Sequence, residues 1–200
     1  MQMNGLQEIL HNKYLVISVM GPHAGESVKG IFDRKIGDIE NVGKTFWLNR
    51  SQKARPIMVQ RLCHEAKNEG HDCHCVFIEP SSKGGALPAS SQESAKGFSK
   101  DGTAWYDFPS GLGPVTGKIG SGSQALVFDQ LEMAKSISYI NLWDYADFTN
   151  ETLPLKIILG VSTLCAIKKD MRNHKDKMAS NHRRVVAIGR ICEPYCVYLR

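Results

Sequence analysis

The stretch Tyr14-Leu-Val-Ile-Ser-Val-Met20 decides the predicted fold, because it is a nearly continuous apolar run. Such a run is typical of a strand that is buried on both faces of a parallel sheet. It follows Lys13, as the apolar part of a signal peptide follows a basic residue, but no small-residue cleavage site comes after it. We therefore expect the first strand of a sheet here.

A helix pattern follows this strand. Ser27 can cap the start of a helix that runs to about Val42, and Gly43 is suited to end it. The apolar residues of this stretch recur at helical spacing, namely Val28, Ile31, Phe32, Ile36, Ile39 and Val42.

The same alternation is then repeated. A second strand is expected at Thr45–Leu48, and a second helix has Pro56 in its first turn and Gly70 as its stop. The third strand is expected at Cys75–Ile78. Residues 12–80 therefore predict a β-α-β-α-β unit with right-handed crossovers and parallel strands.

The rest of the chain has fewer helix signals. Residues 81–123 are rich in Gly, Ser and Pro, yet they contain enough large apolar side chains to pack as an ordered, extended loop region with short strands. Residues 124–200 are expected to form a mixed or antiparallel β-rich half. Its strand-like segments before the basic region are Ala125–Leu131, Ile137–Leu142, Leu155–Leu159 and Val161–Ile167.

A β-hairpin is expected to close the chain. It would pair Arg184–Cys192 with Tyr195–Leu199 across a turn at Glu193-Pro194. The expected fold class is therefore α/β in the mixed α+β sense, in a single domain over residues 1–200.

Composition limits the class of protein. The chain has 200 residues, of which 42% are hydrophobic and 22% charged, as is usual for a globular domain. The longest mostly apolar run, Ile157–Ile167, is shorter than the roughly 20 residues of a membrane span, so no membrane association is expected. Six cysteines are too few for a disulfide scaffold, so we expect free thiols and a cytoplasmic location. A net charge of +5 favours acidic partners such as nucleic acids or nucleotides.

Three loops form the first candidate site. They follow the three predicted parallel strands, whose carboxyl ends would meet at one edge of the sheet. Basic residues, glycines that open a helix and hydroxyl groups suit a phosphate-bearing ligand there. The expected ligand-binding residues are Gly21, Gly25, Ser27, Arg50, Lys53, Ser82 and Lys83. No complete nucleotide-binding motif is present, so ordinary turns and surface charges remain the alternative.

The same loops could also be catalytic, in phosphoester hydrolysis or in nucleotidyl or phosphoryl transfer. His23 and Glu79 are then the expected general acid and base, because histidine titrates near neutral pH and burial can tune a carboxylate. Glu26 would assist proton transfer or hold a divalent metal ion, which is the possible cofactor.

A cysteine and histidine cluster is the second candidate site. Its weak candidate metal ligands are Cys63, His71, Cys73 and Cys75. Their spacing fits a zinc site poorly, because the usual pairs of cysteines two to four residues apart are not both present. Cysteines packed in the core are the favoured interpretation, and a zinc-stabilised structural protein is the alternative.

A basic segment, residues 168–184, is the third candidate site. Its expected nucleic-acid contacts are Lys168, Lys169, Arg172, Lys175, Arg183 and Arg184. The aromatic residues that could stack on bases are Trp105, Tyr106, Trp143 and Tyr145. Under this hypothesis the β-rich half is a non-catalytic nucleic-acid reader or a protein-interaction module, and the alternative is a solvated loop between two strands.

Overall fold

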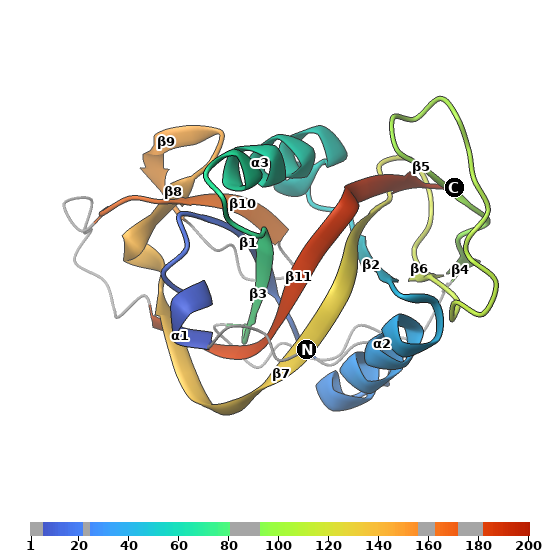
Figure 1. Ribbon diagram of the computed structural model, residues 1–200, viewed down its shortest axis with the longest axis horizontal. Coiled ribbons are helices and arrows are strands. Elements are labelled where there is room, and N and C mark those ends of the chain that lie inside the picture. Colours follow the sequence, from blue (N-terminus) through green and yellow to red (C-terminus); the bar gives the residue numbers. More distant parts are fainter. Residues whose placement is uncertain (1–5, 22–24, 81–92, 156–162, 172–181) are drawn as a thin grey trace.

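The computed structural model describes residues 6–21, 25–80, 93–155, 163–171 and 182–200. The protein is a mixed α+β structure in which strands predominate over helices (Figure 1). Its helical elements are α1 (Leu6–Ile9), α2 (Val28–Val42), η1 (Gln52–Ala54), α3 (Pro56–Asn68) and η2 (Leu142–Asp144). Its strands are β1 (Tyr14–Val19), β2 (Thr45–Asn49), β3 (His74–Ile78), β4 (Glu93–Ser94), β5 (Phe98–Ser99), β6 (Thr116–Gly117), β7 (Gln124–Asn141), β8 (Tyr145–Asp147), β9 (Asn150–Pro154), β10 (Thr163–Lys168) and β11 (His182–Leu199).

Most of the strands belong to one mixed sheet. Its order is β2-β7-β11-β3-β1-β10-β8-β9, with β5 paired to β11, and β4 and β6 form a separate pair. The strands β1 and β3 are parallel neighbours, as the sequence predicts. The other pairings in the large sheet are antiparallel.

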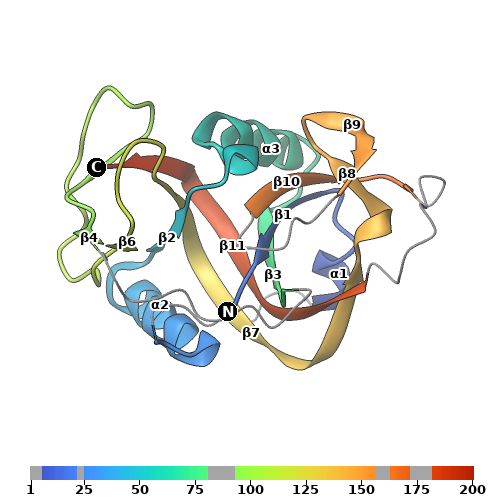
Figure 2. The same ribbon diagram turned by 180° about the vertical axis from the view of Figure 1, so that it is seen from behind.

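The position of β2 differs from the prediction. The order of strand, helix, strand, helix and strand is present, but β2 pairs antiparallel with β7 at the edge of the sheet. Two long strands, β7 and β11, separate it from β3. Figures 1 and 2 show that β2 runs in the opposite direction to β1 and β3. The three strands therefore do not form one parallel unit.

The local signals of the first half are confirmed. All six residues of β1 are buried, as expected for its apolar run. The Ser27 hydroxyl oxygen accepts a hydrogen bond from the Gly30 amide at 3.1 Å and caps α2, and Gly43 ends this helix with a φ of 78°. Pro56 lies in the first turn of α3.

The second half is antiparallel, but it contains no closing hairpin. The segments expected at Ala125–Leu131 and Ile137–Leu142 belong largely to the single strand β7, and β11 runs without reversal from His182 to Leu199 beside it. Around Glu193-Pro194 the register shifts, because Ile191 is opposite Phe128 and Cys196 is opposite Leu126. The extra residues of β11 form a bulge rather than a turn, so the strand continues. Most of the segment expected at Leu155–Leu159 lies outside the described residues, and β9 occupies Asn150–Pro154.

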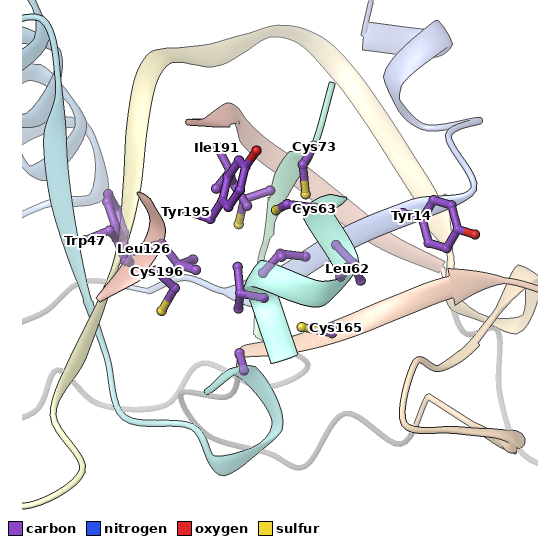
Figure 3. Packing of buried hydrophobic residues seen from close by; sticks show 14 of the residues in the cluster. Tyr14, Trp47, Leu62, Cys63, Cys73, Leu126, Cys165, Ile191, Tyr195 and Cys196 are labelled. Carbon is purple, nitrogen blue, oxygen red and sulfur yellow. The ribbon is translucent and has the colours of Figure 1, made fainter. Parts of the chain in front are cut away.

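The apolar core lies on both faces of the sheet. On one face α2 and α3 pack on the strands, with Phe32 and Leu62 in the same cluster as Phe77. On the other face α1 packs with alternate strand residues, among them Leu15 and Val76. Figure 3 shows part of the first cluster, including four of its cysteines.

The described part of the Gly-, Ser- and Pro-rich region contributes side chains to the apolar core. Phe98, Phe108 and Val115 pack in a third cluster with Phe46 of β2 and Val127 of β7. Residues 81–92 lie outside the described part of the chain. Among the helices that the structure describes, none has the length and apolar character needed to cross a membrane.

Candidate functional site

The ends of β1 and β3 lie together, as predicted. The Met20 amide donates to the Ile78 carbonyl oxygen at 2.8 Å, and a Cβ atom at Gly21 would lie 3.8 Å from Cγ of Pro80. The loops that follow these two strands therefore start side by side. His23, Ser82 and Lys83 belong to these loops and lie outside the described residues.

The loop after β2 lies elsewhere, which corrects the prediction of three converging loops. Along the ladder Asn49 is opposite Gln124, which is opposite Tyr198, whereas Ile78 of β3 is opposite Val185. Val185 and Tyr198 are near opposite ends of β11, so Arg50 and Lys53 do not join Gly21 and Glu79. The physical reason is the antiparallel pairing of β2 with β7, which reverses the direction of β2.

Lys53 has a different partner. Its Nζ atom lies 2.7 Å from Oδ2 of Asp147, at the end of β8. Burial of the Asp147 carboxyl group opposes ionisation, but hydrogen bonds from Lys53 and Thr149 outweigh it and lower its pKa. Lys53 therefore links the turn after β2, at one edge of the sheet, to β8 near the other edge.

The two described candidate catalytic carboxylates each bind an arginine. Glu26 accepts from Nη2 of Arg34 at 2.9 Å, and Glu79 accepts from Nη1 of Arg184 at 3.1 Å. Gly25 has a φ of 80°, as a turn before the helix requires, and the Ser27 hydroxyl group is used as the cap of α2. Among the described residues, these contacts do not place a general acid, a general base and a phosphate-binding cation together at one site.

The candidate metal ligands divide between the core and the surface. Cys63, Cys73 and Cys75 are buried in one core cluster, of which Figure 3 labels Cys63 and Cys73, whereas His71 is exposed. Burial raises the pKa of the Cys63 and Cys75 thiols, which favours the neutral form over the thiolate that binds metal. No group of three or more His, Cys, Asp or Glu side chains in the described parts of the chain could hold a metal ion. These contacts fit the favoured interpretation of packed core cysteines.

The described part of the basic segment is divided between two ends of the sheet. Ile167, beside Lys168 and Lys169, is opposite Tyr14 at the start of β1. The Nζ atom of Lys168 donates to the His11 carbonyl oxygen at 3.3 Å, and that of Lys169 lies 3.5 Å from a carboxylate oxygen of Glu151.

Arg183 and Arg184 lie at the other end, beside the end of β3. Arg172 and Lys175 lie outside the described residues. The four described basic residues therefore do not form one continuous contact surface.

Arg184 lies on an exposed surface that the sequence does not predict. Arg184 on β11 is directly opposite Tyr139 on β7, so both side chains project from the same face of the sheet. Tyr139 is 57% exposed, and Ile137, two residues earlier on β7, is 70% exposed. We call Ile137, Tyr139, Arg184 and Glu79 the β7–β11 surface.

Arg183 projects toward the opposite face. It is opposite Ile140, which is buried in the core cluster of that face. The Nε atom of Arg183 is buried and has no hydrogen-bond acceptor among the residues that the structure describes. The two neighbouring arginines, which the sequence groups together, therefore have different surroundings.

The four aromatic residues predicted to stack on bases do not form a common surface. Tyr145 is buried, and its hydroxyl group donates to the Leu10 carbonyl oxygen at 2.7 Å. Trp143 is half-buried, and the Arg200 guanidinium lies over the Trp105 ring. Tyr106 is exposed but packs against Phe98, whose strand pairs with the end of β11 that is far from Arg184. Among the described residues, Tyr145 is opposite Lys168 but buried, whereas Tyr139 is exposed and opposite Arg184.

Comparison with known proteins adds no assignment. The chain matches no protein-family model, no curated protein and no solved structure. Its function must therefore be inferred from the residues and their geometry.

Proposed function

We propose that the protein is a non-catalytic nucleic-acid-binding protein and that the β7–β11 surface is its contact site. The observation that carries this proposal is the cross-strand pair of Tyr139 and Arg184. An exposed guanidinium group binds phosphate oxygens well, and an exposed aromatic ring offers a flat apolar face to a base.

The ion pair between Arg184 and Glu79 is compatible with this role. It joins one guanidinium nitrogen to one carboxylate oxygen at 3.1 Å, and both side chains are about half exposed. Exposed ion pairs of this kind contribute little net stability, so a phosphate group can compete for the guanidinium. The N–H groups of Arg184 that do not contact Glu79 can donate to a phosphate oxygen, while Glu79 holds the side chain in place.

Overall charge supports the same partner. The chain carries a net charge of +5, which favours association with a polyanion over association with a basic or neutral surface. Phosphate contacts of this kind supply affinity without reading the base sequence. We therefore expect binding that depends strongly on salt and weakly on sequence.

Charge reversal at Arg184 tests the proposal. With a fluorescently labelled mixed-sequence oligonucleotide, Arg184→Glu is expected to weaken binding about tenfold at low salt. The slope of log K against log salt concentration should fall by about 1, because one phosphate contact is lost. Fluorescence anisotropy over a range of salt concentrations measures both quantities.

Lys67→Glu is the matched control, because it makes the same charge change at an exposed site on α3. It should leave the salt slope unchanged and lower affinity much less than Arg184→Glu. Equal affinities for wild type and Arg184→Glu at every salt concentration would rule out the β7–β11 surface as the contact site.

A further inference from the structure

Residues 137–139 of β7 have their apolar and polar side chains on the faces opposite to those that burial favours. Ile137 and Tyr139 point outward, whereas Ser138 between them is only 5% exposed. Burial of apolar surface is the main favourable contribution to folding, so the reverse arrangement is expected for this stretch. A local departure from the folding pattern of this kind is typical of a functional surface.

A bulge in β7 produces this arrangement. Ser138 is opposite Val185, but Met133 is opposite Ala187, so Val186 faces the four residues from 134 to 137. The extra residues carry β7 out of the ladder and back into it, which re-aims the side chains that follow. Figure 1 shows the bend of β7 in this part of the sheet.

The backbone of Tyr139 is held in the sheet although its ring is exposed. The residues on both sides of it, Ser138 and Ile140, are buried, and its backbone is paired with that of Arg184. Arg184 is held in turn, because the Glu79 amide donates to its carbonyl oxygen at 3.0 Å. The backbones of the two residues are therefore held on neighbouring strands, which lie about 5 Å apart in a sheet.

We propose that Tyr139 is a stacking platform for an unpaired base, so that the β7–β11 surface takes single-stranded nucleic acid; this rests on the nucleic-acid binding proposed above. The ring is the stacking surface, and Arg184 binds the phosphate of the same nucleotide or of its neighbour. Bases in a duplex are stacked on each other, so their flat faces are not accessible to a tyrosine ring. An exposed aromatic ring beside a cation is instead the arrangement that binds single strands.

Two substitutions at Tyr139 test this inference against a 12-nucleotide mixed-sequence single strand, prepared as DNA and as RNA. Tyr139→Ala is expected to weaken binding about tenfold, which is the usual effect of losing one stacked base. Tyr139→Trp should restore binding, because indole stacks at least as well. Tyr106→Ala is the matched control, because Tyr106 is also exposed but lies away from Arg184. It should leave affinity unchanged.

Two further probes separate stacking from phosphate contact. One is the same strand with abasic sites, and the other is a hairpin duplex of equal length. Wild type should bind both probes about as weakly as the Tyr139→Ala variant binds the normal strand. The variant and wild type should bind each of these two probes with equal affinity. Arg184→Glu should weaken the abasic strand as well, because its phosphates remain.

The possible failures are distinguishable. If the duplex binds as tightly as the single strand, or Tyr139→Ala has no effect while Arg184→Glu does, the stacking inference is wrong and the proposed function stands. If Arg184→Glu has no effect on any probe, or no probe binds, the proposed function and the stacking inference are both wrong. Thermal unfolding of each variant verifies that the exposed substitutions leave the fold intact.

Discussion

Cys192 differs from the other cysteines of the chain in its access to solvent. It is half-buried on β11, whereas Cys63, Cys73, Cys75, Cys165 and Cys196 are buried. Burial raises the pKa of the Cys192 thiol to about 11, against the ordinary value of 9.0. At pH 8 about one molecule in a thousand therefore carries the reactive thiolate.

Alkylation of the native protein tests this difference. We expect iodoacetamide to modify Cys192 alone and slowly at pH 8, with a rate that rises about tenfold for each pH unit up to about pH 10, because the thiolate is the nucleophile. Mass spectrometry of the alkylated peptides measures the rate at each site. Denaturant should make all six thiols reactive, and comparable rates at Cys63 and Cys192 in the native state would contradict the buried core.

The residues that the sequence predicts correctly are those whose role depends on near neighbours. Ser27, Gly43 and Pro56 act at helix ends, and each role is set by the few residues beside it. The exposure of Tyr139 depends instead on a bulge and on a partner strand that is distant in sequence. In the sequence, Tyr139 belongs to a stretch in which apolar and polar residues alternate. This alternation predicts that Ser138 and Tyr139 lie on opposite faces of a strand, but it does not predict which face is buried.

At the scale of elements, α2 is joined to its neighbours by a buried polar network. Asp38 accepts from the Thr45 hydroxyl group at 2.7 Å, from the Gly113 amide at 2.9 Å and from Nζ of Lys35 at 3.3 Å. Asp38 and Lys35 are both buried, and burial lowers the pKa of Lys35 although Asp38 opposes the shift. The network links α2, the start of β2 and the Gly-rich region in one place.

Asp38→Asn is expected to lower the free energy of unfolding by about 3 kcal/mol at pH 7, because it leaves the buried Lys35 charge without its partner. A lysine whose folded pKa is lowered releases its proton more readily in the folded protein than in the unfolded chain, so stability rises with pH between the folded value and 10.5. Without Asp38 this window is wider, so the difference from wild type should shrink as pH rises to 10. Urea unfolding at several pH values measures it.

Asp33→Asn is the matched control on the same helix. Asp33 pairs with Lys29 on the exposed side of α2, so its loss should change the free energy of unfolding by less than about 1 kcal/mol at any pH. A loss from Asp38→Asn no larger than that from Asp33→Asn would show that the buried network does not stabilise the fold.

At the scale of the whole molecule, pairing between distant strands decided what the sequence could not predict. The periodicity of residues 12–80 gave the right elements in the right order, because helix and strand patterns are local. It did not reveal that β7 and β11 insert between β3 and β2, because this order depends on contacts across most of the chain. The candidate site changed for the same reason, since the three predicted loops share an edge only if β2 is parallel to β1 and β3.

The large sheet is curled. The evidence is that η1, which follows the edge strand β2, contacts β10, although β10 lies near the other edge of the sheet. The ion pair of Lys53 and Asp147 marks this closure, since it joins the turn after β2 to the end of β8 at 2.7 Å. A carbodiimide couples a lysine to a carboxylate only when the two are in contact. We therefore expect a zero-length cross-link between Lys53 and Asp147, identified by mass spectrometry after proteolysis.

The same cross-linking experiment discriminates the observed topology from the predicted parallel unit. In the parallel unit Lys53 would lie beside Glu79, and those two residues would be joined instead. The exposed pair of Lys67 and Glu193, 3.1 Å apart, is the internal control for the chemistry. Lys53→Arg should abolish the Lys53 product alone, because the guanidinium does not couple. A cross-link from Lys53 to Glu79 would require β2 to run parallel to β3, and the antiparallel ladder between β2 and β7 would then be wrong.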